Sequence, residues 1–397
     1  MHKLSTLLGM PQHRFASIHV VGTNGKSSVT RMTAALLEAH GLSAGACVSP
    51  HASRWSERVL VHGEEIGPAE FAAAVNRVAE AADVVNRTLE EGEAVTQFEV
   101  ATAAAFVALA AARVKVAAVE AGLGGRLDAT NTIPSRVTVL TSIGRDHTQW
   151  LGDTEEEIAA EKLAVLRDQS TLVLGRVSPA VMALAEKVAH ERGARLVVAP
   201  EDPGPRLRLR AAGGFQRRNF ALACSAAAAL LGELDAERIA EIGAALSIPG
   251  RLERIGEHPP AFVDAAHNPD GAAALAEALP EIAPGQPVIA CLAMLRDKDA
   301  TATIAALAPA LEGAVCTELP ARALRARGLP GAASHPARVL AGACEAAGLP
   351  AKAEPAFDIA LRRSREQASA RPGGVLLVTG SHYAAMPARE ALALCED

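Results

Sequence analysis

Short apolar runs alternate with longer helix-like segments through the first half of the 397-residue chain. Strands separated by helices of this length form βαβ units, in which the strands are parallel and helices cover both faces of the sheet. The sequence therefore predicts an α/β fold with a mostly parallel sheet, and such sheets bind ligands at the carboxyl ends of their strands. The predicted strands are residues 18–21, 44–48, 114–120, 137–143 and 171–174, and the predicted helices are residues 28–40, 93–112 and 154–167.

A proline–glycine step at residues 249–250 interrupts this pattern. Proline followed by glycine ends a helix and suits a hinge between domains. We therefore expect two domains, residues 1–247 and 253–397, joined by a linker of residues 248–252. The second domain carries its own α/β series, with strands predicted at residues 261–263, 287–293 and 375–379 and a helix at residues 271–279.

Composition narrows the class of protein. Hydrophobic residues are 50% and charged residues 21% of the chain, as in ordinary globular proteins, and alanine-rich runs such as residues 101–112 indicate helices packed through small side chains. The net charge of −6 and the absence of a basic stripe argue against a nucleic-acid partner. Six scattered cysteines with no C-x-x-C pair indicate reduced thiols and a cytoplasmic protein. We expect no membrane association, since no run approaches the ~20 apolar residues of a membrane helix and no signal peptide is visible.

Residues 22–28, Gly-Thr-Asn-Gly-Lys-Ser-Ser, lie between a predicted strand and a predicted helix. Backbone N–H groups and the helix dipole hold phosphate at such a junction, and glycines let the backbone approach closely. A lysine here can reach the terminal phosphates and a hydroxyl can bind magnesium. The segment is shorter than the Walker pattern, but strand, loop and helix follow in the order that phosphate binding needs, which disfavours a chance glycine turn. The predicted nucleotide-binding residues of the loop are Gly22, Thr23, Asn24, Gly25, Lys26, Ser27 and Ser28.

The G-T-N-G-K-S sequence resembles the phosphate loop of Mur ligases and folylpolyglutamate synthases. Several other segments, from residue 18 to about residue 299, resemble the same family in the same order. They are S-P-H at residues 49–51, E-A-G-L-G-G-R-L-D-A-T-N at 120–131, D-H at 146–147, I-A-A-E-K at 158–162, P-G-R at 249–251 and D-A-A-H-N-P at 264–269. The chain is thus similar to the folylpolyglutamate synthase and dihydrofolate synthase family of the Mur ligase superfamily. The resemblance implies a P-loop-type central domain followed by a smaller, Rossmann-like α/β domain.

The resemblance also implies a reaction. Such ligases use ATP to phosphorylate a carboxylate, and an amine then attacks the acyl phosphate, releasing phosphate. The expected substrates are L-glutamate and dihydropteroate or a reduced folate, and the expected cofactors are ATP and two magnesium ions. Phosphoryl transfer requires mainly positioning and charge neutralisation, and magnesium prefers oxygen ligands. A monomer is expected by the same resemblance.

Individual roles follow from the resemblance. Ser28 is expected to hold magnesium at the ATP phosphates, and Ser49, Glu120 and His147 are expected to hold the second metal. Lys162 corresponds to a carbamoylated lysine, and Lys26, Asp128 and His147 to further catalytic residues. The expected contacts in the nucleotide site are Asn219 with adenine, Arg251 with phosphate, Asp264 with ribose, and His267. Thr96 and Phe98 are expected near the pterin and Arg126 near a substrate carboxylate.

Some of these assignments have a simpler structural alternative, and His147 fits an ordinary core or loop histidine. Lys162 fits a solvated lysine in a Glu–Lys pair, and Asp128 fits a turn residue that caps the following segment. Phe98 fits a core position and Arg126 fits an ordinary surface arginine. The position of Lys162, fifteen residues after His147 as in the family pattern, favours the functional interpretation.

The sequence departs from the family pattern at several positions, and two other functions compete with the folate ligase. Ser27 stands where folate ligases commonly have glycine, Ala265 replaces the glycine of D-G-A-H-N, and T-G-S-H-Y at residues 379–383 only partly matches the family's end. A Mur-type ligase acting on a cell-wall precursor is one alternative, although such enzymes usually carry an additional N-terminal domain and only about seventeen residues precede the first strand here, which argues against it. A nucleotide-binding switch or transport protein is another, although such proteins lack the segments at residues 120–131 and 264–269. The choice between dihydrofolate synthase, folylpolyglutamate synthase and both remains open.

Overall fold

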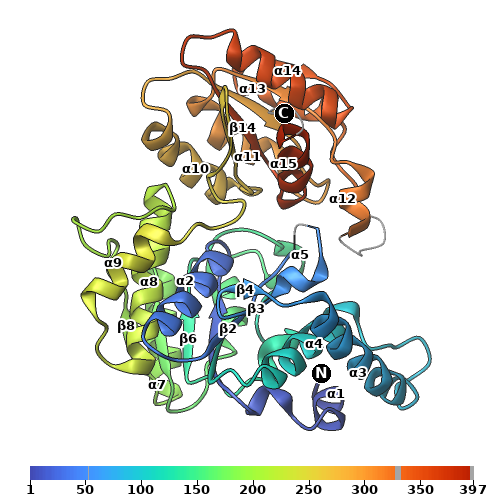
Figure 1. The fold of residues 1–397 in the computed structure, drawn as a ribbon, viewed down its shortest axis with the longest axis vertical. Helices are drawn as coiled ribbons and strands as arrows, with labels where there is room; N and C mark the ends of the chain where they lie inside the picture. The colour runs from blue at the N-terminus through green and yellow to red at the C-terminus, as the bar shows by residue number, and fades with distance from the viewer. Residues whose placement is uncertain (52, 327–331, 394–397) are drawn as a thin grey trace. The chain divides into compact units, whose positions relative to one another are not determined.

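The structure is a computed structural model that describes residues 1–51, 53–326 and 332–393. The chain forms two compact units (Figure 1). One contains Met1–Arg208 and Arg217–Leu246, and the other contains Leu209–Gln216 and Ser247–Asp397. Each unit is built on a mostly parallel sheet, which confirms the predicted fold class. No helix within the described ranges is long and apolar enough to cross a membrane.

The first unit carries a sheet that, within the described residues, has eight strands in the order β4-β3-β2-β5-β1-β6-β7-β8. The strands from β2 to β8 in this order are parallel, whereas β3 and β4 form an antiparallel edge. The central strands β5 and β6 are fully buried and β1 is buried after its first residue, as expected for a parallel sheet with both faces covered. The strands are β1 (Ala16–Val21), β2 (Ala44–Cys47), β3 (Val59–Val61), β4 (Glu64–Glu65), β5 (Val116–Glu120), β6 (Val137–Leu140), β7 (Thr171–Leu174) and β8 (Arg195–Val198).

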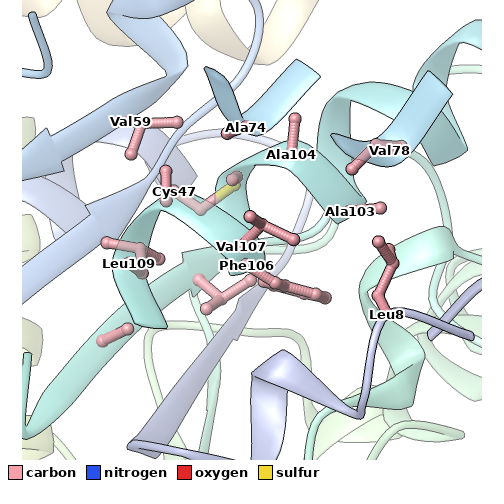
Figure 2. Close-up of a cluster of buried hydrophobic side chains, with 14 of the residues drawn as sticks. Leu8, Cys47, Val59, Ala74, Val78, Ala103, Ala104, Phe106, Val107 and Leu109 are labelled. Atoms are coloured by element: carbon pink, nitrogen blue, oxygen red, sulfur yellow. The ribbon is translucent and has the colours of Figure 1, made fainter. Parts of the chain in front are cut away.

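Helices cover this sheet and pack through small side chains. In α4 (Gln97–Ala111), alanines lie beside the buried ring of Phe106 (Figure 2). Residues of α3 (Pro68–Asn86), among them Val78, pack on the same helix. Because alanine has no side-chain rotamers to lose, such a helix packs closely at little entropic cost. The other helices of this unit are α1 (His2–Leu7), α2 (Lys26–Ala39), α5 (Thr148–Leu151), α6 (Glu155–Leu163), α7 (Pro179–Glu191), most of α8 (Gly214–Leu231) and α9 (Ala236–Ala245).

The second unit has a sheet whose described strands follow the order β13-β12-β11-β14-β10-β9. All neighbours are parallel except β9, which runs antiparallel to β10. The strands are β9 (Glu253–Glu257), β10 (Pro260–Val263), β11 (Val288–Leu292), β12 (Gly313–Cys316), β13 (Ala351–Ala353) and β14 (Val375–Thr379). The helices are α10 (Pro269–Ile282), α11 (Ala300–Leu307), α12 (Ala321–Ala326), α13 (Ala337–Ala346), α14 (Phe357–Ser369) and α15 (Ala385–Ala393).

A short segment, residues 209–216, which includes the start of α8, belongs to the second unit, although the sequence predicts it in the first domain. Ala212 and Phe215 pack against the apolar cluster around α10. The N–H groups of Gly213 and Gly214 donate to the Glu281 carboxylate at 3.1 and 3.0 Å. These contacts tie residues 209–216 to α10.

Several predicted elements have different ends in the structure, and three of them illustrate the physical reason. The helix predicted over residues 93–112 begins at Gln97, because Thr96 caps it and Glu99 completes a capping box. The strand predicted over 137–143 ends at Leu140, and the following residues turn to hold the phosphate loop. The helix predicted over 154–167 ends at Leu163, since Val165 and Leu166 turn into the core.

Candidate active site

The phosphate loop joins β1 to α2 and depends on two glycines. Gly22 and Gly25 have φ values of 148° and 83°, a backbone region that favours glycine. A Cβ at Gly22 would collide with Thr141 Oγ1, and a Cβ at Gly25 would lie 2.5 Å from Asn219 Oδ1. Asn219, on α8, therefore lies directly beside the loop. A residue with a side chain at either glycine would disturb this packing.

The end of β6 fixes the backbone of the loop. Thr23 N donates to the Ser142 carbonyl at 2.8 Å, and Thr141 Oγ1 donates to the Asn24 carbonyl at 2.6 Å. Lys26, the first residue of α2, folds back and its Nζ donates to the carbonyls of Gly22 and Thr23 at 3.0 Å each. The loop thus presents a positive charge and a helix N-terminus together, an arrangement that binds phosphate.

Ser28 lies in the first turn of α2 and is 1% exposed. Its Oγ has no hydrogen-bond partner among the described residues. A buried hydroxyl without a partner is costly, so this atom suits a ligand that it would contact. Magnesium fits the position, because it prefers oxygen ligands.

Glu120 ends β5 and is nearly fully buried. Its Oε1 accepts a hydrogen bond from Ser27 Oγ at 2.9 Å, and its Oε2 accepts one from Ser49 N at 2.8 Å. The strands β2, β5 and β1 are neighbours, so their carboxyl ends bring Ser49, Glu120 and the phosphate loop together. The predicted pair Ser49 and Glu120 is therefore in contact, and Ser27 joins it.

A hollow opens beside Glu120. Phe98 lies against Gly122, where a Cβ would overlap the phenyl ring. Arg58 stacks over Trp55, with Cζ 4.6 Å from the ring centroid, and its Nε donates to His51 Nδ1 at 2.9 Å. Thr96 is exposed and caps α4. The hollow is lined by Cys47, Val48, Ser49, Arg58, Phe98, Ala101, Thr102, Glu120 and Thr130.

Asp128 is held by the loop that contains it. Its Oδ2 accepts a hydrogen bond from Leu123 N at 2.8 Å, and its Oδ1 accepts one from Thr130 N at 2.9 Å. These bonds match the capping role that the sequence allows for Asp128. Asp128 as a whole is buried, with 9% of the residue exposed.

Lys162 is 4% exposed at the end of α6. Burial lowers the pKa of its amine to about 7, the Lys26 cation lowers this pKa as well, and Asp146 and Asp128 raise it. A solvated lysine in a Glu–Lys pair is thus the wrong description of this residue. Its neighbour Glu161 is the half-exposed member and accepts a hydrogen bond from Arg126 Nε at 2.9 Å.

His147 precedes α5 and has a left-handed backbone, with φ of 55°. Its N–H donates to Asp146 Oδ1 at 2.9 Å, and its Nε2 lies 3.8 Å from the same oxygen. Asp146 therefore lies beside both the backbone and the ring of His147. Within residues 1–51, 53–326 and 332–393, no three His, Cys, Asp or Glu side chains form a metal-binding cluster, so a metal near Glu120 would rely on other oxygen ligands as well.

In the second unit, a polar cluster lies where β10 and β14 end. Asp264 is buried and accepts hydrogen bonds from the N–H groups of Leu252 and Ala266 at 3.0 and 2.8 Å. Burial raises the pKa of Asp264, and Arg251 is the main opposing influence. Arg251 Nη2 lies 2.9 Å from His382 Nε2, and the His267 ring centroid is 6.1 Å from that of His382.

Comparison with known proteins identifies the family of this chain. The Mur ligase middle domain matches residues 20–202, and the Mur ligase glutamate ligase domain matches residues 250–382. The dihydrofolate synthase/folylpolyglutamate synthase of Mycobacterium tuberculosis is 36% identical over 356 residues, 79% of this chain and 72% of that protein. The chain belongs to the folylpolyglutamate synthase and dihydrofolate synthase family.

Solved structures of this family share the fold. The M. tuberculosis folylpolyglutamate synthase complexed with ADP has a TM-score of 0.89 and 33% identity, covering 98% of this chain and 93% of that chain. A bifunctional folylpolyglutamate synthase/dihydrofolate synthase with Mn, AMPPNP and L-glutamate bound has a TM-score of 0.81 and 28% identity, covering 98% and 92%. ATP binding and a small-molecule substrate are therefore supported for this family member.

Three residues of the site region were not assigned roles from the sequence. Asp146 accepts a hydrogen bond from the His147 backbone, His382 contacts Arg251, and Arg58 lines the hollow. For two of them the sequence carried a signal, because Asp146 lies in the D-H segment and His382 in the partly matching T-G-S-H-Y segment. The roles of these three residues depend on contacts that appear only in the folded chain, so the sequence alone did not assign them.

Proposed function

We propose that this family member joins the amino group of L-glutamate to a carboxylate of dihydropteroate or a folate, converting ATP to ADP and phosphate. The observation that carries the proposal is the convergence on Glu120, which links Ser27 of the phosphate loop to Ser49 beside an apolar-walled hollow. A nucleotide phosphate and an aromatic carboxylate substrate would meet at this point.

The reaction has two steps in this proposal. The substrate carboxylate attacks the γ-phosphorus of ATP, so that an acyl phosphate forms and ADP leaves. The glutamate amine then attacks the acyl carbon, phosphate leaves, and the amine loses a proton. Lys26 and the loop N–H groups hold the phosphates, and Asn219 would contact the adenine. Arg251, Asp264 and His267 are proposed as the nucleotide contacts supplied by the second unit.

Two magnesium ions are proposed. The first would bind Ser28 Oγ, a buried hydroxyl whose lack of a partner supports a ligand there. The second would bind Glu120, with Ser49 and His147. Magnesium at these positions supplies positive charge that neutralises the transferring phosphoryl group.

We also propose that Lys162 is carbamoylated. A neutral lysine amine adds CO₂, forming an N–C bond and losing one proton, and the product is an anion. The lowered pKa of Lys162 supports this reaction, because it supplies the neutral amine near pH 7. The carbamate would orient the second magnesium, with Asp128 and His147 as the remaining catalytic residues.

The pterin end of the substrate is proposed to bind at Phe98, whose ring lines the hollow. Thr96 caps the first turn of α4, which carries Phe98, and would contribute to the pterin site by holding this turn. Arg126 is proposed for a substrate carboxylate, since it is exposed and its partner Glu161 lies on the surface beside it. Arg126 could exchange its ion pair with Glu161 for one with a substrate carboxylate at little cost in free energy, because exposed ion pairs contribute little to stability.

Phosphate release from MgATP tests the proposal. L-glutamate is supplied together with dihydropteroate in one series and with tetrahydrofolate in another. Release that requires both glutamate and a pterin supports the ligase and identifies the branch. Release without any pterin, or release independent of glutamate, would contradict the folate assignment and leave a nucleotide-hydrolysing site. We further propose a monomer, which light scattering coupled to gel filtration would check.

A further inference from the structure

His19 lies in β1, the strand that leads into the phosphate loop, and its side chain is fully buried. Its Nε2 is 2.8 Å from Thr130 Oγ1, whereas its Nδ1 has no hydrogen-bond partner among the described residues. Thr130 Oγ1 in turn lies 2.5 Å from Asp128 Oδ1. A chain of contacts thus runs from the interior of β1 through Thr130 to the Asp128 carboxylate.

The donors in this chain can be assigned from the chemistry of the groups. An ionised carboxylate only accepts hydrogen bonds, so the single proton of the Thr130 hydroxyl points to Asp128. His19 Nε2 must then carry a proton and donate to Thr130 Oγ1. Nδ1 is left as the unprotonated nitrogen, which agrees with its lack of an acceptor.

A charged His19 does not fit this site. Protonation of Nδ1 would place an N–H group in the core with no acceptor among the described residues. Burial, with the nearby Arg167 cation, lowers the pKa of His19 to about 3. The ring is therefore a neutral donor throughout the physiological pH range.

We propose that His19 is a positioning residue for Asp128, an inference that rests on the proposed function. The carboxylate receives three donors, Leu123 N on one oxygen and Thr130 N and Oγ1 on the other. His19 fixes the direction of the hydroxyl proton and so the rotation of the carboxylate. Strand β1 then positions two parts of the site. Its carboxyl end leads into the phosphate loop, and its His19 side chain positions Asp128 through Thr130.

Kinetics of five variants test this role. His19→Leu removes the donor, and we expect kcat to fall about tenfold, as for loss of a hydrogen bond to a charged network, with KM for ATP within about twofold. His19→Gln places an amide donor near Nε2 and should recover most of the lost kcat. Thr138→Val is the matched control, since Thr138 is buried beside His19 on β6 and its hydroxyl has no partner among the described residues. Combining His19→Leu with Thr130→Val should be no worse than Thr130→Val alone.

Equal losses in the Leu and Gln variants, or additive losses in the double variant, would overturn the proposal. A second measurement, which does not depend on enzymatic turnover, tests the role of His19 separately from the proposed ligase function. The ¹⁵N shifts of the His19 ring should report a protonated Nε2 and a bare Nδ1, unchanged between about pH 5 and pH 8. A protonated Nδ1, or titration within that range, would refute the proton assignment, whereas missing glutamate-dependent turnover in the wild type would refute only the proposed function.

Discussion

The Lys162 amine offers a quantitative test of the site, through its reaction with CO₂. With a pKa of about 7, in place of 10.5, roughly 90% of the amine is neutral at pH 8, against roughly 0.3% for an ordinary lysine. Only the neutral amine forms a carbamate. Lys162 should therefore carry about 300 times more carbamate than an exposed lysine of equal intrinsic reactivity.

Carbon-13 NMR with labelled bicarbonate measures this difference directly. The protein is titrated from pH 6 to pH 9 at constant dissolved CO₂, without nucleotide or metal. As pH falls through about 7, Lys162 becomes charged and its carbamate signal should disappear; as pH rises through that value the signal should grow. Exposed lysines should contribute only at much higher pH.

Variants assign the signal and link it to activity. Lys162→Arg cannot become neutral, so it should lack the signal and lose kcat by about a hundredfold or more. Lys187→Arg, at an exposed lysine paired with Glu191, is the control and should match the wild type. A Lys162→Arg spectrum with the same carbamate signals as the wild type, or a wild-type signal that appears only where exposed lysines react, would refute the reasoning.

Three further changes give separate expectations. Ser28→Ala removes the unpartnered hydroxyl, so kcat should fall about a hundredfold and the magnesium dependence should weaken; unchanged magnesium titrations of phosphate release would contradict the metal role. Gly25→Ala introduces strain at φ of 83° and a Cβ 2.5 Å from Asn219 Oδ1, and urea unfolding should show a loss of about 1–3 kcal/mol. Gly122→Ala displaces the Phe98 ring and should raise KM for the pterin roughly tenfold; a larger change in KM for ATP would argue against a pterin site there.

Buried parallel strands are readable from a sequence because they form continuous apolar runs between turn residues. The strands predicted at residues 171–174 and 375–379 match β7 and β14. The antiparallel edge was missed, because β3 and β4 have only three and two residues. A signal existed at His62 and Gly63, which both have positive φ and form a two-residue hairpin turn.

In the candidate site, the part formed by one contiguous segment was predicted from the sequence, whereas contacts between distant segments were not. The phosphate loop is contiguous, so its glycines, lysine and serines could be assigned from the order of strand, loop and helix. The bond from Ser27 to Glu120 joins residues 93 positions apart, and the contact of His19 with Thr130 spans 111. Such pairs depend on strand order and side-chain direction, which one sequence does not specify.

Residues 209–216 belong to the second unit although the stretches before and after them belong to the first, and this affects how the protein would respond to a cut in its backbone. The backbone passes between the units after Arg208, after Gln216 and after Leu246, which makes three covalent connections. Cleavage at residues 248–252 would break one of them and leave the contacts of Phe215 and of the 213–214 backbone with the α10 region intact. A protease that cuts there should yield two fragments that elute together under native conditions and separate only when the protein is unfolded.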